Sequence, residues 1–141
     1  GKFSIVVRKL HRSTGLKFLT RSWVLHDLGC RVISVDKAPL DRKIAKLPRI
    51  SFMQESAFGL DPAQTEAVEW LCSDIICYPE RLYTLVQNWI ETDMVKNMIC
   101  TLKFQGETDF DAVRQFEAIP GSHIKHLYVN KHELTWFWSK L

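Results

Sequence analysis

The 141-residue sequence lacks several features that define whole classes of protein. No uninterrupted apolar run approaches the roughly 18–20 residues of a transmembrane helix, which predicts that no membrane is a partner. The start, Gly1-Lys2-Phe3-Ser4, lacks the charged-then-apolar layout of a signal peptide. P-loop and G-x-S-x-G motifs are also missing, which argues against ordinary NTPase and acyl-transfer chemistry.

The four cysteines form no C-x-x-C pair, and three of them sit inside apolar runs, where a cysteine behaves as a small hydrophobe. Neither cysteines nor histidines show the ligand spacing of a zinc site, so the sequence predicts no metal centre. This cysteine usage indicates a reducing, cytoplasmic setting.

What the sequence does contain fits a single packed domain, with 46% hydrophobic residues and a net charge of +3. The charge is uneven. Residues 1–50 hold 12 Lys and Arg against 3 Asp, a balance of +9, whereas residues 51–141 hold 7 against 13, a balance of −6. A basic end on an acidic body is a candidate footprint for a polyanion, and a solvated charged face is the alternative.

Strand and helix patterns alternate along the chain. Three helices are predicted. The first covers 22–28 and is closed by Gly29, and the second begins at Pro79, where apolar residues recur at helical spacing. The third covers 109–118. A short helix is also predicted from Ser13 or Thr14 to Leu19. Strands are predicted at 5–7, 31–35, 50–54, 68–73, 97–102, 123–129 and 133–138.

This alternation predicts an α/β fold with a mostly parallel sheet and helices on both faces. The last two strands, joined by a tight turn at Asn130-Lys131-His132, must form an antiparallel hairpin. Five tryptophans raise the alternative of a base-stacking platform, but core packing is the better interpretation for Trp136 and Trp138, which share a sheet face.

Charged residues stand at one edge of this predicted sheet. Asp36, Asp74 and Lys103 each end an apolar strand, and Glu133 begins the last, reversed strand. Because ligands of open α/β sheets bind outside the carboxyl ends of the strands, we expect Asp74, Lys103 and Glu133 to converge there. The alternative is that polar residues end strands simply because strands emerge into water.

These residues resemble a known family. Together with Lys17 in Arg12-Ser13-Thr14-Gly15-Leu16-Lys17, the residues Asp74, Lys103 and Glu133 resemble the Lys-Asp-Lys-Glu tetrad of RrmJ/FtsJ-type RNA ribose 2′-O-methyltransferases. The likeness is to the RlmM-like large-subunit ribosomal RNA enzymes in particular. It extends through Ser22-Trp23, Gly29-Cys30-Arg31-Val32 and Val35-Asp36, and covers the chain from about His11 onward.

The resemblance implies a Rossmann-like methyltransferase fold that uses S-adenosylmethionine, with large-subunit ribosomal RNA as the substrate. It also implies catalytic roles for Lys17, Asp74, Lys103 and Glu133, with Lys103 as the general base for the ribose 2′-hydroxyl. Burial and a second cation, here Lys17, favour the neutral amine that a base requires. The implied cofactor-binding residues are Trp23, Asp36, Ser56 and Asp74.

The sequence departs from the family in two places. Ser56 stands where an acidic residue usually contacts the adenine. The family's first strand and glycine-rich loop should lie between Lys17 and Trp23, where only Phe18-Leu19-Thr20-Arg21-Ser22 are found.

We therefore expect a segment to be missing near residues 19–22, leaving the sheet without its central strand. The methyltransferase domain would cover 11–141, and 1–10 would be a remnant or linker of an N-terminal region.

Two functions follow from this reading. The first is S-adenosylmethionine-dependent ribose methylation of RNA. The second is a non-catalytic RNA- or protein-binding module that kept the fold and lost the cofactor loop. Oligomeric state and the target nucleotide are not specified by the sequence.

Overall fold

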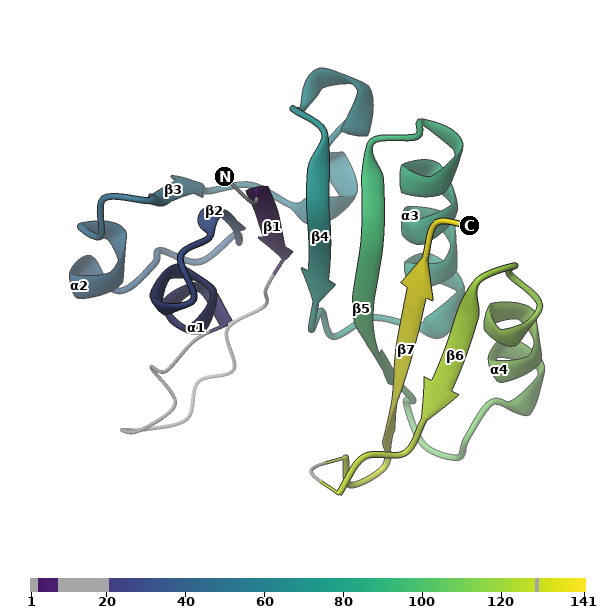
Figure 1. Cartoon of the computed structure of the whole chain (residues 1–141). Helices are drawn as coiled ribbons and strands as arrows, with labels where there is room; N and C mark the ends of the chain where they lie inside the picture. The colour runs from purple at the N-terminus through teal and green to yellow at the C-terminus, as the bar shows by residue number, and fades with distance from the viewer. Residues whose placement is uncertain (1–2, 8–20, 129) are drawn as a thin grey trace.

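The computed structural model describes residues 3–7, 21–128 and 130–141, and these form one seven-stranded sheet in the order β3-β2-β1-β4-β5-β7-β6 (Figure 1). Strands β1 to β5 pair in parallel, while β7 is antiparallel to both of its neighbours. The strands are β1 (Phe3–Val7), β2 (Arg31–Val35), β3 (Ile50–Met53), β4 (Val68–Ser73), β5 (Val95–Lys103), β6 (Ser122–Lys125) and β7 (Glu133–Ser139).

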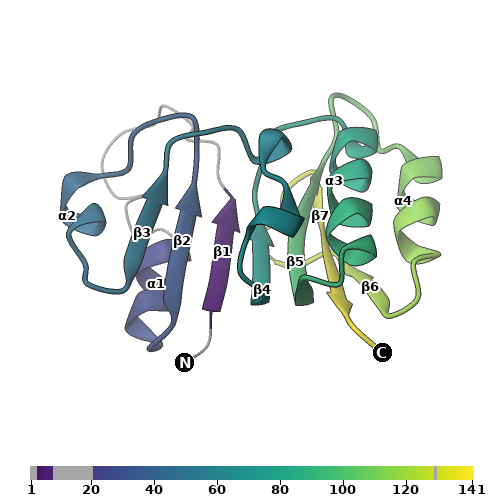
Figure 2. The same cartoon turned by 90° about the horizontal axis from the view of Figure 1, so that it is seen from above.

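Helices cover both faces of the sheet, as Figures 1 and 2 show from two directions. They are α1 (Arg21–Asp27), α2 (Arg42–Ala45), α3 (Pro79–Glu91) and α4 (Phe110–Glu117), with two short 3₁₀ turns, η1 (Ala57–Gly59) and η2 (Pro62–Gln64). Leu25 of α1 and Ile44 of α2 pack on one face, whereas Leu82 of α3 and Phe116 of α4 pack on the other. The predicted Rossmann-like arrangement is confirmed.

The helix ends follow from local chemistry. Gly29 has a φ of 86°, and Cys30 N donates to Leu25 O at 2.9 Å, which is the Schellman ending predicted for α1. Pro79 occupies the first turn of α3, where its missing N–H costs nothing. Asp109 caps α4, because its side chain accepts a hydrogen bond from Ala112 N.

The core divides into two clusters on opposite faces of the sheet. Along β4, Leu71 belongs to one cluster and Cys72 to the other, as the period of two in a strand requires. The large cluster contains 16 buried residues, mostly from β4, β5, β7 and the helices α3 and α4. The small cluster consists of Cys30, Val32, Ile44, Ile50 and Cys72.

The expectation of a sheet without its central strand is wrong. The strand Phe3–Val7 lies between β2 and β4 and pairs with both. Residues treated above as a remnant therefore supply the third strand of the sheet, next to the central strand β4. The helix predicted from Ser13 or Thr14 to Leu19 lies in 8–20, outside the described residues. The segment expected to be missing near 19–22 overlaps that range and stays a prediction.

The terminal hairpin is confirmed, but its tight turn is not. Strand β6 ends at Lys125, so the connection to β7 covers residues 126–132. The physical reason is Asn130, whose buried side chain accepts from Leu127 N at 2.8 Å and from Thr135 Oγ1 at 2.9 Å. These bonds hold the backbone in a turn where strand pairing would otherwise continue. Within the described residues, no helix has the length and apolar character needed to span a bilayer.

Candidate active site and cofactor cavity

The predicted site residues that the structure describes lie at the carboxyl edge of the parallel strands. Asp36 directly follows β2, Asp74 directly follows β4, and Lys103 is the last residue of β5. Glu133 begins the antiparallel strand β7 and so lies at the same edge. This edge is the lower end of β4 and β5 in Figure 1.

Lys103 and Asp74 are in direct contact. Lys103 Nζ lies 2.8 Å from Asp74 Oδ1 and donates to the Asp74 backbone carbonyl at 3.1 Å. The Lys103 side chain is 16% exposed, and that of Asp74 is 44% exposed. The amine is therefore held at two points near the end of β4 while the carboxylate remains open to solvent.

Glu133 is the direct cross-strand partner of Lys103 in the β5–β7 ladder. Directly opposite residues place their side chains on the same face of a sheet, with Cβ atoms about 4.5–5.5 Å apart. Leu102 and Leu134 pack with the large cluster, so Lys103 and Glu133 point to the other face. The structure thus brings Asp74, Lys103 and Glu133 together as the sequence predicts.

Asp36 and Ser56 line a separate cavity of about 250 Å³. Asp36 is 6% exposed, and its Oδ1 accepts a hydrogen bond from Ala38 N at 3.0 Å. A carboxylate has further acceptor sites for hydroxyl donors. Ser56 caps η1, because its Oγ accepts from Phe58 N at 3.3 Å.

Apolar side chains and one stacked cation line the same cavity as Asp36. Ala57, Phe58 and Ile75 line it, and the Arg81 guanidinium lies 3.7 Å from the centre of the Phe58 ring. This is the geometry of a cation–π contact. It fixes the first turn of α3 against η1 and closes one side of the cavity.

These residues fit the nucleoside part of S-adenosylmethionine. A buried acid at the end of the second strand suits the ribose hydroxyls, as in dinucleotide-binding folds. The apolar wall from Phe58 and Ile75 suits a flat purine ring. A larger cavity of about 540 Å³ along α3 shares Ala57, Phe58 and Arg81 with this one. We favour the smaller cavity because it contains Asp36, the acid that ends a strand.

The structure does not bring every predicted site residue to this edge. Lys17 lies outside the described residues. Trp23 lies on α1, is 38% exposed, and is not part of the described cavity lining. The sequence interpretation missed Phe58 and Arg81. The available signal was the element order, which carries the chain from Asp74 at this edge straight into the first turn of the predicted helix.

No group of three or more potential metal ligands occurs among the residues with described positions. The arrangement itself is an amine in contact with the Asp74 carboxylate and directly across the ladder from Glu133, at the same sheet edge as a cavity of about 250 Å³.

Comparison with known proteins defines the class first. No family model matches the chain. An rRNA methylase from Streptococcus thermophilus superposes with a TM-score of 0.62 at 10% identity, covering 99% of this chain and 88% of that one. The Burkholderia thailandensis 1,6-didemethyltoxoflavin-N1-methyltransferase, whose structure contains bound S-adenosylhomocysteine, superposes with a TM-score of 0.62 at 14% identity over 97% and 70% of the two chains. The fold is that of a Rossmann-like methyltransferase.

The chain is also similar in sequence to ribosomal RNA methyltransferases. The chain is 27% identical over 124 residues to "Ribosomal RNA large subunit methyltransferase M" of Aromatoleum aromaticum, covering 81% of this chain and 33% of the relative. It is 28% identical over 119 residues to the protein of the same name from Halorhodospira halophila, covering 81% and 34%. The resemblance predicted from the motifs is confirmed. The chain spans about a third of the length of these relatives.

Proposed function

We propose that this domain transfers a methyl group from S-adenosylmethionine to a ribose 2′-hydroxyl of large-subunit ribosomal RNA, in the cytoplasm. The observation that carries the proposal is the Lys103–Asp74 contact at 2.8 Å with Glu133 directly opposite, at the same sheet edge as a nucleoside-sized cavity. The relatives named as large-subunit rRNA methyltransferases support methyl transfer and the substrate class.

In this proposal Lys103 is the general base. Its Nζ would accept the proton that the ribose 2′-hydroxyl loses as the oxygen becomes a nucleophile. Asp74 would position that amine through the two contacts at its side chain and carbonyl. Glu133, across the ladder from Lys103, would orient the sugar. Lys17 stays the predicted second cation of the site.

Bound S-adenosylmethionine would supply the methyl group, and Asp36 would accept hydrogen bonds from its ribose hydroxyls. Ser56 would face the adenine end of the cavity without adding a charge, and Phe58 would pack against the ring. A fixed geometry of this kind lowers the barrier by holding two reactants in register, which is worth about 7–11 kcal/mol in ideal cases.

The test separates binding from chemistry. Calorimetric titration with S-adenosylhomocysteine measures cofactor affinity. Transfer of a tritiated methyl group to ribosomal RNA measures the rate of the reaction. Lys103→Ala should lower methyl transfer by about 10²–10⁴-fold, the usual contribution of a general base, and change cofactor affinity less than twofold. Asp36→Ala should instead weaken S-adenosylhomocysteine binding by about tenfold or more, since hydrogen bonds to a charged group are worth about 1.5–3 kcal/mol.

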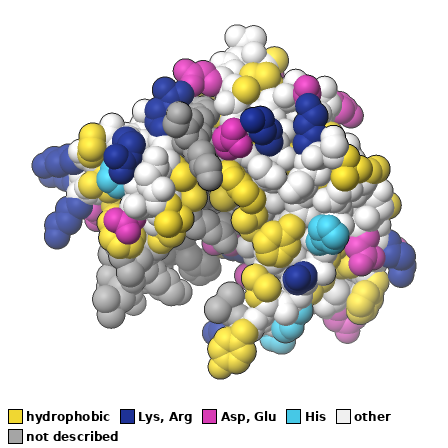
Figure 3. All heavy atoms as spheres, viewed as in Figure 1, with side chains coloured by type: hydrophobic (Ala, Val, Ile, Leu, Met, Phe, Trp, Pro, Cys, Tyr) yellow, Lys and Arg dark blue, Asp and Glu magenta, His cyan; other side chains and the backbone are white. Residues whose placement is uncertain are grey.

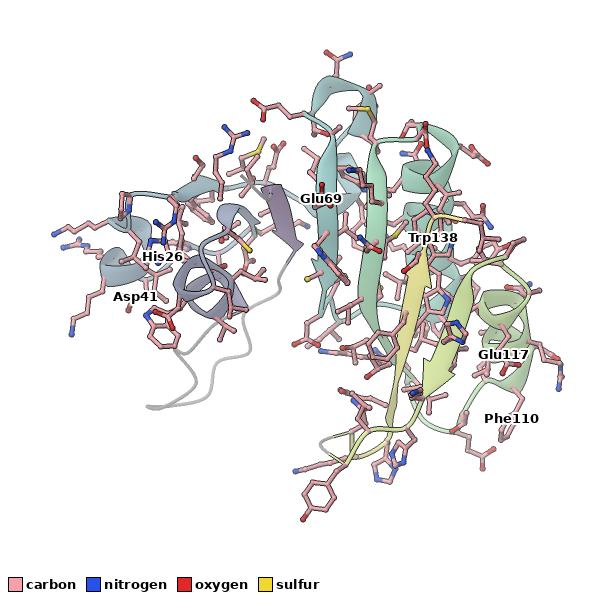
Figure 4. The ribbon with its side chains drawn as sticks, in the orientation of Figure 1. His26, Asp41, Glu69, Phe110, Glu117 and Trp138 are labelled. Atoms are coloured by element: carbon pink, nitrogen blue, oxygen red, sulfur yellow. The ribbon has the colours of Figure 1, made fainter. Side chains whose placement is uncertain are left out.

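Lys96→Ala is the matched control. Lys96 is a lysine of the same strand, but it pairs with Glu69 at 2.9 Å near the amino end of β4, where Figure 4 labels Glu69. This variant should keep both cofactor binding and methyl transfer.

Resistance of the methylated RNA to alkaline cleavage at one site identifies the 2′ oxygen as the acceptor. If Lys103→Ala binds the cofactor and still transfers the methyl group at the full rate, Lys103 is not the general base. Absence of cofactor binding would favour the non-catalytic RNA- or protein-binding module.

A further inference from the structure

The loop between β6 and β7, residues 126–132, lies at the same sheet edge as the candidate site (Figure 1). The chain passes from this loop directly into Glu133, which is the cross-strand partner of Lys103. The loop is therefore joined to the end of the strand that faces Lys103 across the ladder.

The loop has a fixed base. Asn130 is 8% exposed, and its Oδ1 accepts both Leu127 N at 2.8 Å and Thr135 Oγ1 at 2.9 Å. Its backbone N–H donates to Leu127 O at 2.9 Å, and a His126 ring nitrogen lies 3.2 Å from Lys131 O. These bonds tie both ends of the turn to one another and to β7.

The loop carries an aromatic side chain, Tyr128, that the fold does not bury. Tyr128 has a relative exposure of 104%, the highest of the large hydrophobic residues described, and it directly follows Leu127, where the turn begins. The ring therefore contributes nothing to the core. Because the turn is hydrogen-bonded and the ring is exposed to water, the aromatic face is available to a planar partner.

The surroundings of Tyr128 carry positive charge. From Ser122 to His132 the sequence holds two lysines, three histidines and no acidic residue, although residues 51–141 as a whole carry a balance of −6. Lys125 and Lys131 flank Tyr128 and are exposed. In Figure 3 the lower tip of the molecule combines hydrophobic, histidine and Lys or Arg side chains.

We propose that Tyr128 stacks on a base of single-stranded RNA next to the methylated nucleotide, and that Lys125 and Lys131 contact the flanking phosphates. The proposal rests on the proposed function, since it names how the same site holds its substrate. Aromatic stacking with adjacent cations is the usual way to bind single strands without reading their sequence. One tyrosine and a part-exposed leucine offer too little apolar surface for a protein interface, which needs a larger buried core.

The test is fluorescence anisotropy of a fluorescein-labelled, 12-nucleotide single-stranded RNA of mixed sequence with the whole chain. Tyr128→Ala should weaken RNA binding by about tenfold, within the range measured when one stacked base loses its aromatic partner. Tyr128→Phe keeps the ring face and should bind within about twofold of the wild type. Lys125→Ala and Lys131→Ala should each reduce the slope of log affinity against log salt by about 0.7, the value for one phosphate on a single strand.

Phe110→Ala is the matched aromatic control. Phe110 is 66% exposed, begins α4 between Asp109 and Asp111, and lies on the outer side of that helix in Figure 4. This change should leave RNA affinity unaltered. Equal RNA affinity of Tyr128→Ala and wild type would overturn the proposal, as would an equal loss in Tyr128→Phe, because that result assigns the contact to the hydroxyl.

S-adenosylhomocysteine affinity, measured on the same variants, should not change. Suppose that the wild-type protein binds S-adenosylhomocysteine but Tyr128→Ala has the same RNA affinity as the wild type. The stacking inference then fails, while the proposed methyl transfer stands. If S-adenosylhomocysteine does not bind and RNA affinity depends on Tyr128, the enzymatic proposal fails and the RNA surface stands.

Discussion

The two hydrophobic clusters of this domain differ in size and in what they support. The large cluster holds bulky, fully buried rings, among them Trp89, Trp136 and Phe116. Among the residues whose burial is described, the small cluster contains five buried residues, none of them aromatic. Trp23 of its covering helix α1 is 38% exposed, and Leu28, which follows that helix, is 73% exposed. Among these described residues, the large cluster therefore buries the bulkier side chains.

Both parts of the candidate site are attached to the large cluster. Asp74 and Lys103 follow or end strands whose Leu71 and Leu102 belong to it, and Asp36 directly follows Val35, which belongs to it as well. A proton acceptor must be held accurately, and a nucleoside cavity tolerates more movement because closure can accompany binding. The comparison teaches that the proposed chemistry and the proposed cofactor cavity both depend on the large cluster, whereas the small cluster supports the opposite face of the sheet.

Trp136→Ala should have the largest effect on stability. Trp136 is completely buried, its ring centre lies 5.5 Å from that of Phe116, and its Nε1–H donates to Ser122 Oγ at 2.9 Å. Removing such a ring costs about 3–5 kcal/mol in the free energy of unfolding. Urea denaturation measures it. Trp136→Phe, which keeps a ring, should cost less than half as much, and a loss below about 1 kcal/mol in the alanine variant would contradict the view of a tightly packed side.

Gly121→Ala should rank second, at about 3 kcal/mol, because it combines backbone strain with overpacking. Gly121 has a φ of 90°, and a Cβ there would lie 2.4 Å from the Ser139 carbonyl oxygen. The same urea experiment measures the change. Gly59→Ala is the control, since an added Cβ would meet no atom within 4 Å. Near-wild-type stability of Gly121→Ala would show that β6 and β7 can separate more easily than their pairing suggests.

Much of this fold could be predicted from local sequence. The β-branched run Arg31–Val35, bounded by Gly29 and Asp36, is a strand with the predicted bounds. The strand-ending positions of Asp74 and Lys103 predicted their meeting, because parallel neighbours end at a common edge. The register that sets Glu133 against Lys103 follows from the antiparallel direction of the last strand.

Other features depend on tertiary placement. The run around Ile5 is typical of a strand, but five residues do not specify which two strands it will pair with. Its position between β2 and β4 was therefore missed. The Arg81–Phe58 contact joins residues 23 positions apart and exists only because α3 begins beside η1. The predicted strand 123–129 ends early, at Lys125, because the buried Asn130 side-chain oxygen satisfies the backbone of the turn locally.

Ile44→Ala probes the small cluster and should cost about 2 kcal/mol, at the lower end of the range for such truncations, because a loosely covered site can collapse. Ile44 is 5% exposed on the short helix α2. Hydrogen exchange gives the sharper measurement. Amides of β2 and β3 should lose protection while those of β5 and β7 keep theirs, as expected for separate opening units. Equal loss across all strands would mean that the two clusters unfold together, and the contrast between them would then concern packing alone.

Gly29→Ala should have the smallest effect, about 1 kcal/mol, and it completes a matched pair with Gly121→Ala. Both glycines have a positive φ, 86° for Gly29 and 90° for Gly121, but a Cβ at Gly29 would meet no atom within 4 Å. Both variants share the backbone strain, but only Gly121→Ala adds a clash. The difference in unfolding free energy between the two variants therefore reports the cost of the contact with the Ser139 carbonyl. Gly29→Asn should recover part of the loss, since asparagine tolerates this conformation at a helix end. Equal costs for the two alanine variants would remove the packing contrast and leave backbone strain as the whole effect.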